Sequence, residues 1–392
     1  MSRKTTDPTG DVSYRFETVE WDESDSSSLV GWRAATLLLA IAATIALFTY
    51  DYYVIPEFRP LVAEWNPKAE DWPFVVSLVI FGLYVLVPVA RNRRLTRYYW
   101  RRLRTNRLAV ASLAWLVVFF ILGLFAPVLV GAPEASPTAI HNPPVGMTVN
   151  NLLAGGCAGE VSNDLCHGSW AHPLGTTGGG RDVLEYTVAG MHTALQLALI
   201  TATILVPIAT AVGTVAAYVG GRVDELLMRY VDVQQVVPAF FVYIIAQFVF
   251  APGLLLIVVV FGLLNWGGMA RLVRSETLQK REEGYVMAAR SAGSSSLNII
   301  RRHIVPNVSN TLVTAVTLQL PLLILIEASL SFLSLGDPAV FSWGQIIGVG
   351  MVDFPYYWWV PTFPVIALGL TVVSLSLLGD ALRDMFDPRT EA

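Results

Sequence analysis

Eight apolar runs divide this sequence, and each is about as long as the hydrocarbon core of a bilayer is thick. Because lipid offers no water to the backbone N–H and C=O groups, runs of this length cross it as helices. Hydrophobic residues make up 54% of the chain and charged residues only 14%, which excludes a soluble globular domain. The sequence therefore predicts an all-α, polytopic membrane protein with spans at 32–53, 73–90, 108–130, 194–219, 233–250, 254–269, 308–332 and 361–378.

Arginine is concentrated between the second and third runs, and this concentration predicts the topology. Eight arginines lie there, and such residues gather on the cytoplasmic side of membrane proteins. We therefore expect both termini and the loop 271–307 inside, and the segment 131–185 outside. A patch for nucleic acid or anionic lipid is the alternative, but arginines that flank two spans ordinarily anchor them. The eight are Arg91, Arg93, Arg94, Arg97, Arg101, Arg102, Arg104 and Arg107.

The N-terminal segment, residues 1–31, is rich in Asp, Glu and Ser. Such a composition cannot bury enough apolar surface to fold, so it predicts a disordered cytoplasmic tail. No short basic region precedes the first apolar run, so we expect no cleavable signal peptide and a first span that is retained.

The segment predicted to lie outside contains both cysteines of the chain, Cys157 and Cys166. Their short separation and the oxidising side of the membrane favour a disulfide, although the sequence does not fix its geometry. The neighbouring His167 and His172 match no standard metal-ligand spacing, so we expect no metal site.

The most specific stretch is the polar loop 282–307, which separates two apolar runs. Small and aromatic residues recur at helical spacing up to Ala292, and Gly293 is suited to the left-handed conformation that ends a helix. Ser294 or Ser295 can then cap a second short helix that runs to about Ile304. We expect Pro306 to close this helix, turn and helix unit.

This stretch resembles the EAA loop of ABC-importer permeases, with its Glu-Ala-Ala start, its glycine and its Leu-Pro ending. Ala288, Ala289 and Gly293 match the motif, and Val305-Pro306 stands in the Leu-Pro place. Met287 replaces the glutamate and His303 the isoleucine, as is typical of the dipeptide/oligopeptide/nickel branch. The resemblance implies a helix that docks on a cytoplasmic ATPase. The residues assigned to this contact are Tyr285, Ala288, Ala289, Gly293, His303 and Pro306.

Other segments are similar to the C-type subunit of the same branch. They are 172–184, where Thr177 stands in place of an aspartate, the turn at Gly220-Gly221, 327–333 and 378–389. The resemblance covers about 97–389 and implies a type I ABC importer permease core of six spans. Residues 91–187 would supply the Arg-rich segment, the first core span and the outer loop, 188–381 the permease domain, and 382–392 a cytoplasmic end. Residues 32–90 would add two extra spans, which makes eight.

Three residues within the apolar runs are candidates for the translocation pathway or a gate: Pro207, Pro321 and Glu327. Proline frees a backbone carbonyl and is tolerated where a cavity or a neighbouring helix satisfies that group; a simple kink is an equally good interpretation. A carboxylate is costly in an apolar run unless it is paired, protonated or wet. For Glu327 we favour a structural bond to a neighbouring helix.

The resemblance implies that the chain is the permease subunit of an ATP-driven importer for dipeptides or oligopeptides, and that it forms half of the pathway. Implied partners are a second, homologous permease in a heterodimer, two ATPases and an extracytoplasmic solute-binding protein. ATP and Mg would be bound by the ATPases, because Thr177–Gly180 lacks the lysine of a phosphate-binding loop. We expect no catalytic residue, metal, cofactor or nucleic acid in this multi-pass cell-membrane chain.

Three alternatives stay open. Nickel or oligosaccharide import fits the same branch, because substrate selection is expected mainly in the binding protein. A secondary transporter driven by an ion gradient would need no ATPase, and the coupling loop disfavours it. A membrane scaffold that transports nothing is the third.

Overall fold

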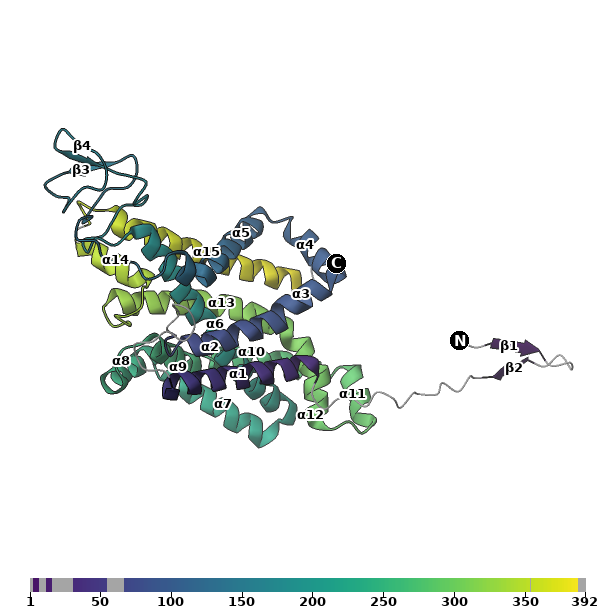
Figure 1. Cartoon of the computed structure of the whole chain (residues 1–392). Helices are drawn as coiled ribbons and strands as arrows, with labels where there is room; N and C mark the ends of the chain where they lie inside the picture. The colour runs from purple at the N-terminus through teal and green to yellow at the C-terminus, as the bar shows by residue number, and fades with distance from the viewer. Residues whose placement is uncertain (1–2, 7–11, 16–30, 55–66, 353, 387–392) are drawn as a thin grey trace.

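The computed structural model describes residues 3–6, 12–15, 31–54, 67–352 and 354–386 of the chain, and this part is largely helical (Figure 1). The N-terminal half of the helical body contains α1 (Trp32–Val54), α2 (Asp71–Phe81), the wider turn η1 (Gly82–Leu86), α3 (Val87–Arg91), α4 (Arg93–Leu103), α5 (Arg107–Leu129) and α6 (Val183–Val219). The C-terminal half contains α7 (Gly221–Val236), α8 (Ala239–Phe250), α9 (Leu254–Leu264), α10 (Gly267–Lys280), α11 (Gly284–Ser291), α12 (Ser296–Ile299), η2 (Ile300–Ile304), α13 (Val305–Phe332), α14 (Trp343–Val352) and α15 (Trp359–Phe386).

Seven helical segments of the described part are long and apolar enough to cross a membrane, and the bent pair α7–α8 makes up to eight. This agrees with the predicted all-α, polytopic architecture. One prediction was wrong in detail, because the span expected at 233–250 is not straight. The helix breaks at Val237, and α7 and α8 are bent by 72°. Pro238 explains the break, since it holds the preceding residue in the extended conformation seen at Val237.

Helix α6 is the centre of the packing, and its side chains are buried along most of its length. Helices α5, α9, α10 and α13 surround it, and small residues let them approach closely. A side chain at Gly213 of α6 would have its Cβ 2.5 Å from the backbone oxygen of Ala270 in α10. At Gly123 of α5 the Cβ would lie 2.9 Å from the oxygen of Met191. These glycines therefore set the distance between the spans.

The two extra helices are attached to this core through α2. The Gln196 amide of α6 donates to Asp71 at 2.7 Å, and the Phe74 ring packs edge-on against His192 with centroids 5.5 Å apart. Helix α1 packs on α2, where Phe48 meets Trp72. Trp32 at the start of α1 lies under the Arg91 guanidinium, 4.6 Å from the ring centroid, so the start of α1 and the end of α3 share one end of the body.

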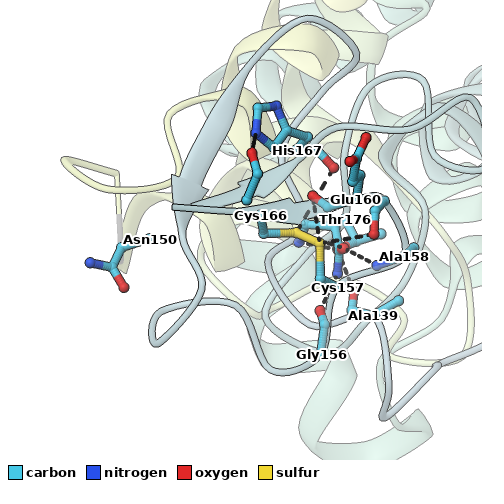
Figure 2. The surroundings of a disulfide bond; sticks show 12 residues. Ala139, Asn150, Gly156, Cys157, Ala158, Glu160, Cys166, His167 and Thr176 are labelled. Atoms are coloured by element: carbon cyan, nitrogen blue, oxygen red, sulfur yellow. Dashed lines mark hydrogen bonds between the residues drawn. A yellow bond between two sulfur atoms is a disulfide. The ribbon is translucent and has the colours of Figure 1, made fainter. Parts of the chain in front are cut away.

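Between α5 and α6 the chain forms a lobe with three short antiparallel strands in the order β3 (Thr148–Asn150), β5 (Leu165–His167), β4 (Val161–Ser162). A disulfide joins Cys157 to Cys166 of β5 (Figure 2), as favoured by their separation in the sequence. The buried side chain of Asn142 donates to Gly156 and accepts from the Ala158 amide, at 2.9 and 2.8 Å. The loops on either side of Cys157 are thus held by side-chain bonds as well as by the disulfide.

The lobe is fixed to the start of α15. Trp359 donates to the backbone of Thr176, and the Tyr357 hydroxyl donates to Leu153 at 3.0 Å. His172, considered above as a metal ligand, instead bonds to Asp182 at 2.8 Å, and Asp182 caps the first turn of α6. Among the described residues there is no cluster of three potential metal ligands.

The N-terminal segment departs from its predicted disorder in two places. An antiparallel pair is formed by β1 (Arg3–Thr6) and β2 (Val12–Arg15), with Arg3 opposite Arg15. Both stretches contain Thr, Val or Tyr, which favour strands. Such a pair is marginal by itself, and residues 7–11 and 16–30 lie outside the described part.

Candidate functional site

The loop that resembles the EAA motif forms a compact unit between α10 and α13. Figure 1 shows α11 and α12 at one end of the helical body, opposite the lobe that carries β3 and β4. The C-terminal part of α10 leads into this unit, and α12 continues through η2 into α13 without a gap.

Gly293 ends α11 in the way that its sequence position predicts. Its φ is +79°, a left-handed conformation that favours glycine. The amide of Ser294 bonds to the carbonyl of Ala289 at 3.1 Å, and the amide of Gly293 bonds to that of Arg290 at 3.0 Å. This pair of bonds is the Schellman motif, which satisfies the last carbonyls of a helix. The turn is therefore a defined structure that depends on one glycine.

An apolar inner side holds the unit against the bundle. Val286 of α11, Ile299 of α12, Ile304 and Val308 are each at most 1% exposed. They join the same apolar core as residues of α6 and α10. Burial of such side chains contributes about 1.5–3 kcal/mol each, so the unit does not move as a free loop.

The outer side of α11 is exposed and consists mainly of small or apolar residues, with the charged Arg290 beside them. Tyr285 is 40% and Met287 53% exposed, and Ala288 is also exposed, whereas Ala289 is only half-buried. No heavy atom lies within 4 Å of the place where a side chain at Gly293 would begin. Of the face predicted from helical spacing, Tyr285, Ala288 and Ala292 are exposed, whereas Ala289 packs against the core. Its contact with another chain stays a prediction.

His303 and Pro306 lie on the second half of the unit. The His303 ring faces Tyr285 with centroids 6.2 Å apart, so the structure brings these two predicted residues together. The expectation for Pro306 was wrong, because it does not close the unit. It lies in the first turn of α13, where its missing N–H costs little. η2 is a π-helical turn, in which the Val305 amide bonds to the carbonyl of Ile300 five residues earlier. This wider turn leaves room for the ring of Pro306 beside the preceding carbonyls.

Two arginines that the sequence did not single out connect the unit to the end of α6. Arg281 donates to the carbonyl of Ala217 at 2.7 Å, and the Arg290 guanidinium lies over the Tyr218 ring, 5.4 Å from its centroid. The end of α10 and α11 are therefore both in contact with the end of α6, the central helix of the bundle. Their partners lie too far away in the sequence for any local pattern to indicate them.

The charges of α7 and α10 hold these two helices together at the same end. Arg274 forms two parallel bonds to Asp224, at 2.5 and 2.6 Å, which is the strong bidentate geometry. Arg271 bonds to Asp232 at 2.5 Å. α7 leads into the bend at Pro238, so these charge pairs fix the first helix of the bent pair against α10.

The three candidate pathway residues do not share one site. Pro207 of α6 is exposed and Pro321 of α13 is buried. Glu327 is 4% exposed and accepts hydrogen bonds from the hydroxyls of Ser331, at 2.7 Å, and Ser342. A depression of about 380 Å³ lies near it, lined by Ser331, Gln345 and Val349 among others, but none of the three candidates lines it. The 2.7 Å bond of Glu327 lies within α13 itself, and a structural role for this residue stays a prediction.

Comparison with known proteins identifies the class. Residues 209–392 match the family model described as "Binding-protein-dependent transport system inner membrane component". Residues 94–144 match that of the N-terminal TM domain of oligopeptide transport permease C. The two matches begin after α1 and α2, and neither covers these helices.

Curated relatives are also named as transport permeases. The dipeptide transport system permease protein DppC of Bacillus subtilis (strain 168) is 34% identical over 75% of this chain and 86% of its own length. The oligopeptide transport system permease protein OppC of the same organism is 31% identical over 74% and 88%. A chain of the MetNI methionine ABC transporter in an inward-facing conformation is 19% identical, with a TM-score of 0.43 over 52% of this chain and 97% of its own.

The fold and these relatives define an integral membrane permease subunit of an ABC transporter. The chain belongs to the family of binding-protein-dependent transport system inner membrane components, which confirms the resemblance seen in the sequence. Because the family and its named relatives are the membrane components, the expectation of a permease in place of an enzyme is confirmed as well.

Proposed function

We propose that this chain is the permease subunit of an ATP-driven importer of dipeptides or oligopeptides, and that it couples to an ATPase through residues 282–307. The observation that carries the coupling role is the unit α11–α12, which has a buried inner side, a fixed glycine turn and an open outer side of small residues. A partner that inserts beside Ala288 and Gly293 would press on a rigid element that is bonded to α6.

The substrate class rests on the relatives. Two curated relatives, each matched over most of its own length, are named as dipeptide and oligopeptide permeases. Peptide import is therefore the first expectation here, and nickel and oligosaccharides are the alternatives to be tested within the same branch.

The proposed complex holds a second, homologous permease, two ATPases that bind ATP and Mg, and an extracytoplasmic solute-binding protein. An open apolar face on α8 supports the contact with a second permease: Phe241 is 61%, Ile245 68% and Phe248 84% exposed. Both termini and α11–α12 would be cytoplasmic, in line with the arginines around α4. The lobe with the disulfide would then face the oxidising side, where the binding protein docks.

Co-purification tests the assembly. The tagged full chain is extracted from its native membrane in mild detergent, and its partners are identified by mass spectrometry. An ATPase and a second permease should accompany the native chain, and a Gly293→Glu variant should lose the ATPase but keep the permease. If the native chain comes out alone under conditions that keep other ABC importers intact, the proposal fails. Uptake of a labelled dipeptide, of nickel and of an oligosaccharide by the complex then decides the substrate class.

A further inference from the structure

Helix α4 links two spans and lies outside the proposed coupling segment, residues 282–307. It follows the segment Asp71–Arg91 and precedes Arg107–Leu129, both of which are long and apolar enough to cross a membrane. A helix between the ends of two spans lies at the boundary of the bilayer. Figure 1 shows α4 beside the C-terminal end of α15, at the end of the body away from the lobe.

One side of α4 is a face of arginines. At 3.6 residues per turn, positions 93, 97, 101 and 104 fall in one stripe, and position 94 lies beside it. All five side chains are exposed. We call this the arginine face: Arg93, Arg94, Arg97, Arg101 and Arg104.

Opposite the arginine face, α4 carries Leu95, Tyr99 and Leu103, and only part of this side is covered by protein. Leu103 is buried in a cluster with Ala381 and Met385, and Tyr99 packs against Phe386. Leu95 is 51% exposed, and Trp100, which lies next to the arginine stripe, is 43% exposed. Trp and Tyr concentrate at the level of lipid headgroups, because one end of each ring is apolar and the other is polar. The protein thus leaves apolar side chains around α4 that a bilayer interface would cover.

Among the residues that the structure describes, no acidic side chain pairs with the arginine face. Residues 91–107 include no Asp or Glu. In the described part of the chain, none of the five arginines forms an ion pair; the pairs seen there join other residues. The neighbouring Arg102 points elsewhere and donates to the backbone of Met385. Five positive charges within three turns repel one another unless an anion lies among them.

We propose that α4 is an interfacial helix whose arginine face binds the headgroups of anionic phospholipids. A guanidinium offers two parallel N–H donors that match the oxygens of a phosphate. The exposed side chains of Leu95 and Trp100, at two places around the helix, set α4 at the depth of these headgroups. A nucleic acid would satisfy the charges equally, but it offers no apolar phase for these side chains.

The consequence is a contact between lipid and the closing helix of the bundle. Leu103 and Tyr99 hold α4 against the last turns of α15, so a headgroup bound to the arginine face also stabilises the C-terminal end of α15. This inference does not depend on which solute is carried or on which leaflet α4 faces.

A lipid titration tests the proposal. The purified full chain in uncharged detergent receives phosphatidylglycerol or phosphatidylcholine with the same acyl chains, and the midpoint of thermal unfolding is followed against lipid concentration. A ligand that binds only the folded state raises this midpoint. Phosphatidylglycerol should stabilise the chain at much lower concentration than phosphatidylcholine, and high salt should reduce the difference.

Variants locate the site. Each arginine near an anionic surface contributes about five- to sixfold, so Arg97→Gln with Arg101→Gln should weaken the apparent affinity for phosphatidylglycerol roughly 30-fold. Arg97→Lys with Arg101→Lys should keep most of it, because the charge stays. Arg222→Gln with Arg229→Gln is the matched control, since it removes two exposed arginines from α7, and it should behave as the native chain.

Three results would overturn the proposal. One is equal stabilisation of the native chain by both lipids. The second is the same lipid response in the Arg97/Arg101 glutamine pair and in the α7 control. The third is stabilisation by inorganic phosphate or a short RNA in place of the lipid. If the glutamine pair fails to fold, the comparison of the two lipids on the native chain and on the lysine pair still decides.

Discussion

Two substitutions of Gly293 distinguish the effect of the backbone conformation of its turn from the effect of the surface that the turn exposes. The φ of +79° costs an L-residue about 1–2 kcal/mol, and no heavy atom lies within 4 Å of the new Cβ to add a clash. Gly293→Ala should therefore open the turn about 5- to 30-fold more often and reduce ATP-driven uptake in part. Gly293→Glu has the same backbone cost, but it also places a long charged side chain on the docking surface, and it should abolish uptake.

A matched control is available beside the lobe, away from α11–α12. Gly131, just after α5, has a φ of +59° and equally open space around its Cβ. Gly131→Glu should lower the thermal stability as Gly293→Glu does, but leave ATPase binding and uptake close to native. Uptake in proteoliposomes and ATPase retention on the tagged chain measure both. Near-native uptake by Gly293→Glu, or an equal loss in Gly131→Glu, would refute the coupling role of the turn.

Three further substitutions test the fold. Gly344→Ala would push its Cβ into a backbone oxygen of α13, so it should lower the unfolding free energy in detergent by about 3 kcal/mol, whereas Gly369→Ala, with nothing within 4 Å, should not. The double substitution Cys157→Ser, Cys166→Ser opens a disulfide loop with a sequence separation of 9, so it should lower the unfolding free energy by about 2–3 kcal/mol. A reductant should lower the stability of the native chain, but not that of this variant. Burial raises the pKa of Glu70, so its ionisation destabilises the fold as pH rises through that pKa; Glu70→Gln should raise the melting temperature at pH 8, and this gain should vanish in acid, below the ordinary pKa of a glutamate.

The sequence predicted the number of spans well because bilayer thickness sets the length of an apolar run. It predicted their ends less well, since polar ends of helices carry no such signal: α6 begins at Val183, well before the apolar run at 194. The bend between α7 and α8 was missed because the predicted run at 233–250 includes only the last four residues of α7, which is otherwise polar. Pro238 was the available signal, because proline constrains the residue before it.

In the coupling loop, local conformation was predictable and tertiary contacts were not. Glycine after a helical pattern predicted the left-handed turn at Gly293, since few other residues adopt that conformation. Pro306 was misread as a stop, because proline is also tolerated in a first helical turn, and the spacing alone does not separate these cases. The bonds of Arg281 to α6 and of Arg274 to Asp224 join residues distant in sequence, which one chain without relatives does not reveal.

The central claim is that ATP hydrolysis by a partner drives transport through this chain. The direct test is uptake of a labelled dipeptide by proteoliposomes that contain the purified complex and its binding protein. Uptake should require ATP on the side of the vesicle membrane that α11–α12 faces, which depends on the orientation of the inserted complex. It should persist when ionophores collapse all ion gradients. Uptake that continues without ATP and stops with the ionophores would contradict the account and identify an ion-coupled transporter.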